Sequence, residues 1–224
     1  MKFNIITLFP EMFSAIKDEG VISRALKNSI ISIKEWQLRH FSSNKYKNVD
    51  DKPYGGGAGM VMQVKPIRDC LRKIKELEPN TQVIYLSPQG DSLNQKLVEK
   101  LATFESLTLL CGRYEGVDQR IVENDIDYEI SIGDYVISGG ELASMVLIDA
   151  VSRRIDNVLG NKDSLNDSFV DNLLDHPHYT RPENIDGESV PEVLLSGNQA
   201  KIDAWRLDQA IKKTKHKRPD ILSD

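Results

Sequence analysis

Apolar residues in the first two thirds of the chain follow two alternating patterns. Short runs of β-branched and aliphatic residues alternate with stretches where apolar residues recur every three or four positions, as from Val64 to Leu77. The first pattern is typical of buried strands and the second of amphipathic helices. Ser92 and Gln95 stand at capping-box spacing, which predicts a helix N-terminus there. We predict strands at 3–9, 31–36, 82–85, 107–110 and 128–132, and helices that begin at 10 or cover 21–27, 64–77, 92–104, 117–123 and 141–154.

This alternation predicts an α/β fold with a mostly parallel sheet and helices on both faces. Three of the strands are followed by loops that carry glycine, at 86–90, 111–116 and 131–141. The last loop also carries large apolar residues, which indicates a tight backbone beside a buried core rather than a linker. Ligands of open α/β sheets collect beyond the carboxyl ends of the strands. We therefore expect the three loops to converge on one ligand if their strands are neighbours.

The helix predicted at 141–154 is apolar almost all round. Such a helix must be covered on both sides, either by the sheet and another element or by a second copy of the chain. We favour a homodimer.

Residues after 157 lose this periodicity and become polar. We expect a main domain at 1–160, an interdomain linker at 161–175 and a small helical domain at 176–224, with few large apolar residues of its own. The aperiodic segment 40–59, which ends in a run of glycines, is either a functional loop or a flexible connection.

Composition is that of a globular protein, with 40% hydrophobic and 28% charged residues among 224. No apolar run approaches the length of a membrane span and no signal-peptide pattern is present, so we expect a cytoplasmic protein. The net charge is −5, yet 201–218 holds seven Lys or Arg against two Asp. This local excess suggests polyanion contacts confined to one end of the molecule, although the residues alone favour the alternative, a solvated helix face. Cys70 and Cys111 show neither metal nor disulfide spacing and are interpreted as packing thiols.

Several familiar site types lack their motifs. Neither the dinucleotide-binding fingerprint nor the phosphate loop ending in Lys-Ser/Thr occurs. His176 and His178 have no accompanying ligand cluster in the sequence, so no protein-bound metal is expected. Two alternatives to an enzyme stay open from the residues alone: a nucleotide-binding α/β protein that uses 55–57 as a phosphate cradle, and a non-catalytic RNA-binding module.

Seven motifs in order resemble the bacterial tRNA (guanine-N(1)-)-methyltransferases of the TrmD type, which belong to the SPOUT class. They lie at 8–13, 51–57, 86–90, 111–116, 131–141, 177–182 and 194–198. The resemblance implies a homodimeric enzyme with a deep trefoil knot in its α/β domain. It also implies transfer of a methyl group from S-adenosylmethionine to ring nitrogen 1 of the guanine immediately 3′ of the tRNA anticodon. A magnesium requirement is implied too, although no motif here assigns a protein site to that ion.

The resemblance also implies roles for single residues. Asp167 would be the base that removes the guanine proton, and Arg153 would face the neighbouring carbonyl oxygen. From sequence alone, Asp167 is interpreted as a solvated loop acid, and Arg153 as a cation that is favourable at a helix C-terminus. Cofactor binding is implied for Leu86, Ser87, Pro88, Gly112, Tyr114, Glu115, Ile132, Gly133, Asp134, Tyr135, Val136, Ile137, Gly139 and Gly140, and RNA binding for Gly57, Gly59, Asp175, Lys212, Lys213 and Lys215.

Overall fold

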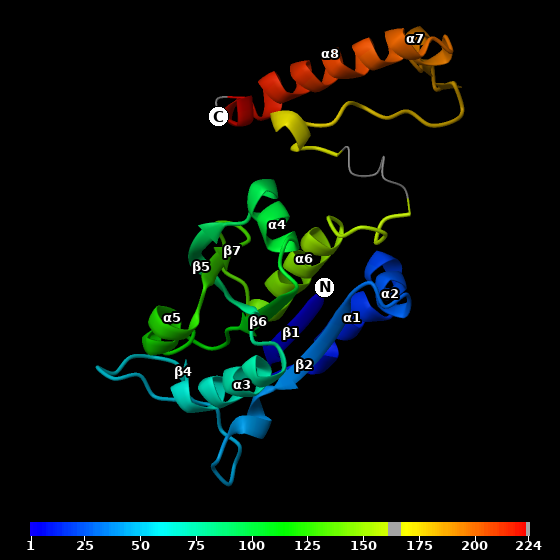
Figure 1. The fold of residues 1–224 in the computed structure, drawn as a ribbon. Coiled ribbons are helices and arrows are strands. Elements are labelled where there is room, and N and C mark those ends of the chain that lie inside the picture. Colours follow the sequence, from blue (N-terminus) through cyan, green and yellow to red (C-terminus); the bar gives the residue numbers. More distant parts are fainter. Residues whose placement is uncertain (161–166, 223–224) are drawn as a thin grey trace. The chain divides into compact units, whose positions relative to one another are not determined.

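The computed structural model describes residues 1–160 and 167–222 (Figure 1). The chain divides into two compact units, Met1–Asn161 and Lys162–Asp224. We describe each unit by itself. The predicted linker 161–175 begins with residues 161–166, which lie outside the described residues.

Five parallel strands form the sheet of the first unit, in the order β2-β1-β6-β5-β7. The predicted α/β fold with a mostly parallel sheet is therefore confirmed. All six residues of the central strand β6 are buried, as expected for a strand covered on both faces. The strands are β1 (Lys2–Thr7), β2 (Ser32–Gln37), β5 (Gln82–Ser92), β6 (Ser106–Cys111) and β7 (Tyr128–Ser131).

Helices cover both faces of this sheet, because neighbouring strand residues point to opposite sides. Ile5 and Leu109 pack in one apolar cluster with residues of α2, α4 and α6, whereas Ile6 and Leu110 pack in another with α3 and α5. The helices are α1 (Ser14–Lys17), α2 (Gly20–Lys27), α3 (Val64–Leu77), α4 (Gln95–Ala102), α5 (Gln119–Asp125) and α6 (Gly140–Ser152), and a 3₁₀ turn at Pro10–Phe13 precedes α1.

Strand β5 differs from its prediction, because it runs on through the predicted loop 86–90 to Ser92. Leu86 and Asp91 both stand in register with Ile130 of β7. Residues 87–90 thus form a bulge within the strand. The predicted capping box is also wrong: Ser92 ends β5, and the N-cap of α4 is Asn94, whose side chain accepts a hydrogen bond from the Leu97 N–H at 2.9 Å.

The segment predicted as an aperiodic loop contains little regular structure. A 3₁₀ turn covers Leu38–Phe41, and the short strands β3 (Asp50–Asp51) and β4 (Val61–Met62) pair antiparallel. Met62 also forms a bridge with Val117. The end of the glycine-rich segment is thereby fixed against the chain that follows β6.

The second unit is built around one long helix, α8 (Gln199–Lys217). Of its described residues, only Ala210 and Thr214 are buried. Its other elements are η4 (Val170–Asn172), the hairpin β8 (Asn184–Ile185) and β9 (Glu188–Ser189), α7 (Glu192–Leu195) and η5 (Pro219–Leu222).

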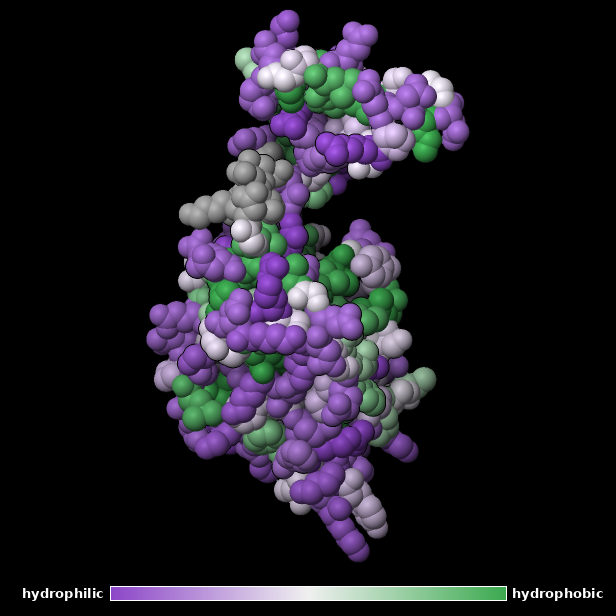
Figure 2. All heavy atoms as spheres, turned by 90° about the vertical axis from the view of Figure 1, so that its right-hand side faces the viewer, coloured by the Kyte–Doolittle hydropathy of each residue, from purple (hydrophilic) through white to green (hydrophobic). Residues whose placement is uncertain are grey.

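Figure 2 shows one face of the chain, on which hydrophilic residues predominate and hydrophobic ones gather in separate patches. Across the described residues, no helix combines the length and apolar character needed to cross a membrane. Both cysteines are free and buried, which agrees with their interpretation as packing thiols.

Candidate functional site

A cavity of about 250 Å³ lies where strands β5, β6 and β7 end or bulge. Its volume is near the lower end of small-molecule pockets, roughly 300–1,000 Å³. Three stretches supply its walls: 85–89 from β5, 112–116 after β6, and 130–133 with 135–140 after β7, together with Ala143. The three loops singled out in the sequence therefore do surround one space.

Backbone contacts hold two of these loops together at the start of α6. The Gly140 N–H donates to the Gly112 carbonyl at 2.9 Å. A Cβ at Gly140 would come within 2.8 Å of the Cys111 Cα, so no larger residue fits there without moving the backbone. After β7, the Ser131 hydroxyl lies 3.0 Å from the Gly133 carbonyl and 3.2 Å from the Gly133 N–H. The cavity wall is thus largely backbone with fixed hydrogen-bonding directions.

Beside this wall lies a buried ion pair between Arg113 and Glu141. The Arg113 Nε and a terminal guanidinium nitrogen each approach Glu141 Oε2 at 2.8 Å, and Glu141 is fully buried. Thr7 donates to the other carboxylate oxygen at 2.8 Å. The guanidinium also donates to the Ser138 carbonyl at 3.1 Å and lies 4.5 Å from the centre of the Phe9 ring. This ion pair therefore connects β1, the loop after β6, the loop after β7 and α6.

The Arg113 guanidinium explains why residue 139 is a glycine. A Cβ at Gly139 would overlap the Arg113 guanidinium. Its φ of 169° is ordinary extended backbone, so close approach alone accounts for the glycine here. A side chain at this position would displace Arg113 from Glu141.

Two titratable groups near the cavity are held neutral. Burial raises the pKa of the Tyr85 hydroxyl, and the opposing hydrogen bond at the Val117 backbone does not cancel it. Burial, reinforced by the charge of Glu141, raises the pKa of the Cys111 thiol, whose sulfur lies 3.2 Å from the Ser144 hydroxyl oxygen. Neither group supplies a nucleophile here. Tyr85, under Gly112, instead forms part of the floor.

All residues predicted to bind the cofactor line this cavity, with the exception of Asp134. Asp134 is exposed within the same loop. Lining residues that the prediction omitted fall into two groups. Gln89, Arg113, Gly116, Ser131 and Ser138 belong to the quoted loops and could have been included, whereas Tyr85, Ile130 and Ala143 stand inside strands or a helix, where only core packing was indicated.

The glycine-rich segment contacts the cavity wall from outside, at Gly59. Glu115 lines the cavity and its side chain lies against the Gly59 Cα, where a Cβ would overlap it. The φ of Gly59 is +86°, a left-handed conformation that also favours glycine. Gly57, by contrast, has nothing within 4 Å of a built Cβ. Of the two glycines predicted to contact RNA, Gly59 contacts the cavity-lining residue Glu115, and Gly57 faces open space.

The two residues predicted to be catalytic belong to different units. Arg153 is the C-cap of α6 in the first unit and is half-buried. Asp167 opens the described part of the second unit and is exposed. Each is described within its own unit.

The remaining predicted RNA contacts lie in the second unit. Lys213 is half-buried and donates to the Asp175 carbonyl at 2.6 Å, whereas Lys212 pairs with Asp208 at 2.7 Å on the surface of α8. Lys215 is exposed. Lys213 therefore positions the chain at Asp175, and Lys212 and Lys215 are the more accessible cations.

A parallel α/β sheet with a cavity beyond its strand ends defines a ligand-binding protein of the α/β class. The sequence model of the family described as tRNA (Guanine-1)-methyltransferase TrmD matches residues 1–224, and the chain belongs to this family.

Similar proteins named tRNA (guanine-N(1)-)-methyltransferase occur in several bacteria. The chain is 53% identical to that of Shewanella sediminis (strain HAW-EB3) over 226 residues, which cover 100% of this chain and 93% of the relative. It is also 53% identical to those of Nitrosospira multiformis, over 99% of this chain and 89% of the relative, and Photorhabdus laumondii, over 100% and 90%.

Proposed function

We propose that this chain methylates ring nitrogen 1 of the guanine immediately 3′ of the tRNA anticodon, with S-adenosylmethionine held in the cavity between β5, β6 and β7. The observation that carries this proposal is the convergence of the loops 86–89, 112–116 and 131–140 on one cavity, in a chain that matches the TrmD family over its whole length. The two alternatives, a nucleotide-binding protein and a non-catalytic RNA-binding protein, are not favoured. Relatives that match this chain over its full length are named as methyltransferases.

The residues present fit an adenosyl group with a charged amino-acid tail. Leu86, Ile132 and Ile137 offer apolar surface for a base. Gly139 and Gly140 bring bare backbone to the cavity wall, at positions where a Cβ would overlap Arg113 or Cys111. The exposed Glu115 carboxylate at the cavity edge suits a cationic amine. When bound, S-adenosylmethionine supplies an electrophilic methyl group on a sulfonium sulfur.

The guanine nitrogen carries a proton at neutral pH, so the enzyme must remove it and stabilise the charge that develops on the carbonyl oxygen. Asp167 would accept the proton and Arg153 would donate hydrogen bonds to that oxygen. A carboxylate is a weak base for this proton, so its orientation and exclusion of water must contribute.

Asp167→Asn tests this assignment. Cofactor affinity in equilibrium dialysis should change by less than about twofold, while single-turnover methyl transfer to an anticodon stem-loop falls roughly 10²- to 10⁴-fold. Asp171→Asn is the matched control, because Asp171 is another exposed acid of the same segment. Transfer by Asp167→Asn at the wild-type rate would refute its role as base. Absence of labelled methyl in any guanine-bearing RNA with the wild-type chain would refute the function itself.

Phosphate contacts by α8 are a further part of the proposal. Seven cations between 201 and 218 support it. Lys212→Ala and Lys215→Ala should each weaken tRNA binding and lower the slope of log affinity against log salt by about one. Lys65→Ala, an equally exposed lysine on α3, is the control. An unchanged slope in both α8 variants would move the RNA contact away from this helix.

A homodimer is supported by the outer side of α6. Leu142 and Val146 are 50% and 49% exposed and stand one helical turn apart. Val146→Lys should shift light-scattering mass from dimer to monomer, whereas Leu77→Lys, at a 53% exposed leucine of α3, should not. A wild-type chain that is monomeric at micromolar concentration would contradict the dimer.

Three further features remain proposals. The trefoil knot is supported by the family match over residues 1–224, and it predicts slow refolding after full denaturation. A magnesium requirement predicts that chelation abolishes transfer until Mg²⁺ is restored. A cytoplasmic location is tested by cell fractionation.

A further inference from the structure

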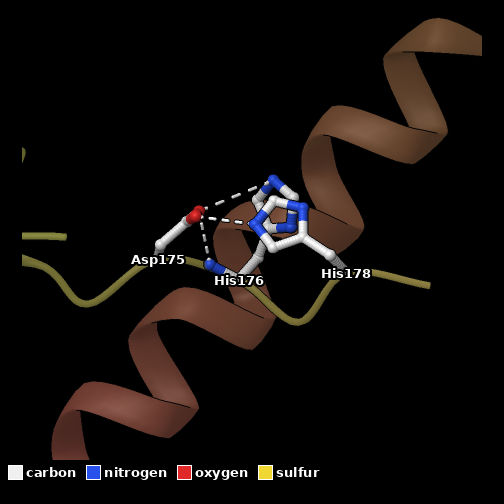
Figure 3. A group of neighbouring side chains, drawn as sticks. All are labelled: Asp175, His176 and His178. Carbon is white, nitrogen blue, oxygen red and sulfur yellow. Dashed lines mark hydrogen bonds and ion pairs between the residues drawn. The ribbon is translucent and has the colours of Figure 1, made fainter. Parts of the chain in front are cut away.

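Three potential metal ligands converge beside α8 in the second unit: Asp175, His176 and His178. Their donor atoms all lie within 4.8 Å of one another. Figure 3 shows both imidazole rings turned toward the same carboxylate. His178 Nε2 is 2.7 Å from Asp175 Oδ2, and His176 Nε2 is 3.7 Å from Asp175 Oδ1.

The backbone explains how both rings reach one side. His176 and His178 are two residues apart in a segment without helix, and in extended chain such residues share a face. Their ring centres are 4.5 Å apart. The two nitrogens that face Asp175 are both Nε2, and neither ring must turn over to present it.

The surrounding hydrogen bonds orient these groups as metal ligands are usually oriented. His176 Nδ1 lies 3.1 Å from the Pro177 carbonyl. A proton donated from Nδ1 to that carbonyl leaves the Nε2 lone pair free toward Asp175, the arrangement typical of metal-binding histidines. Of the two ring Nε2 atoms, only that of His178 is within hydrogen-bond distance of the carboxylate, so Asp175 does not satisfy His176 Nε2.

Asp175 itself is held in place from three sides. Its N–H donates to the Ser168 hydroxyl at 3.0 Å, and its carbonyl accepts from Lys213. The N–H of the preceding residue donates to the buried Thr214 hydroxyl at 2.9 Å. One oxygen of the carboxylate also accepts a hydrogen bond from the His176 N–H at 2.7 Å. The carboxylate is therefore preorganised toward the two rings.

We propose that Asp175, His176 and His178 bind one divalent transition-metal ion of the zinc class. Two imidazole nitrogens and one carboxylate oxygen form a donor set that suits Zn²⁺, whereas Mg²⁺ prefers oxygen ligands alone. His178 is 70% exposed on its side chain, so water completes the coordination. The sequence-based expectation of no protein-bound metal counted the two histidines without the adjacent Asp175, whose carboxylate the local backbone path places beside both rings. This site does not depend on the methyl-transfer proposal.

Competition titration of the tag-free, metal-stripped full chain against a chromophoric zinc chelator tests the site, at a pH where imidazoles are neutral. We expect one Zn²⁺ per chain, and a loss of affinity of roughly tenfold or more in both His178→Gln and Asp175→Asn. His216→Gln is the matched control, since His216 is an exposed histidine of the same unit. It should bind zinc as the wild type does.

A second measurement keeps the result interpretable if a variant is destabilised. Co²⁺ added to the wild-type chain should give visible absorption bands that Zn²⁺ abolishes and about 1,000-fold excess Mg²⁺ does not. Equal zinc affinity in the wild type and His178→Gln, or an equal loss in His216→Gln, would overturn the proposal. Displacement by equimolar Mg²⁺ would also overturn it, because the ligands would then act as a hard-oxygen site.

Discussion

Buried side chains are dense in the first unit and scarce in the second. Strand β6 is buried throughout its length and packs against apolar residues of helices on both faces. Within the described part of the second unit, Ala210 and Thr214 alone are buried, and its chain is fixed by polar contacts such as those of Lys213 and Thr214 to residues 174 and 175. The first unit therefore suits a preformed cavity, and the second suits a surface that adapts to a large ligand.

The difference implies different stabilities, since burial of apolar area is the main favourable term in folding. Each unit carries one tryptophan, Trp36 in the first and Trp205 in the second. Fluorescence of Trp205→Phe and Trp36→Phe backgrounds can thus follow the two units separately. The predictions below follow in order of decreasing effect, and the first and the last use this readout.

The largest effect is expected from Glu141→Gln. This change removes the partner charge of Arg113 inside the first unit and should destabilise it by about 3–5 kcal/mol. Urea unfolding followed by Trp36 measures the loss. Glu99→Gln is the control, because the Glu99–Arg154 pair at 2.9 Å lies on the surface and should contribute about 1 kcal/mol or less. Equal losses of stability in both variants would show that burial does not make the Arg113–Glu141 pair more stabilising than the surface pair.

A smaller, local effect is expected from Thr214→Val. The valine keeps the shape but leaves the Leu174 N–H without its acceptor, which costs about 1–3 kcal/mol. Hydrogen exchange at Leu174 and along α8 should accelerate roughly tenfold or more, while amides of β6 keep their protection. Thr180→Val, at an exposed threonine of the same unit, should change neither. Faster exchange in β6 would mean that the units open together.

How much of this comparison was visible in the sequence depends on the kind of residue. Helix α3 matches its predicted bounds, because its apolar stripe is periodic and uninterrupted. The bulge in β5 was interpreted as a loop, since Ser87 and Pro88 are typical of turns. Arg113 and Glu141 gave no sign of pairing, because the contact spans 28 residues and only the fold brings them together. The Asp175–His178 contact was missed although the residues are near in sequence, since the backbone path between them was unknown.

The smallest effect concerns two short ion pairs, one in each unit. The Arg120 guanidinium lowers the pKa of Asp118, and that of Arg218 lowers the pKa of Asp220. A carboxyl with a lowered folded-state pKa stabilises the fold above its unfolded pKa of roughly 3.9, and this contribution is lost as pH falls through the folded value.

Asp118→Asn should therefore slightly lower Trp36-detected stability at neutral pH and flatten its acid limb below about pH 4 by the same small amount. Asn also keeps the N-cap that Asp118 provides to α5. Asp220→Asn should alter only the Trp205 signal. A steeper acid limb in Asp118→Asn would contradict the sign of this effect.

The place of β1 in the sheet has a consequence for biosynthesis. β1 lies between β2 and β6, and its register with β6 joins Lys2 to Ser106. The ribosome must therefore synthesise the chain past Cys111 before β1 can pair with β6. Contacts so distant along the chain slow folding, and an unpaired apolar strand is prone to aggregate meanwhile. Until Cys111 has been synthesised, chaperones at the ribosome can bind the exposed β1 segment.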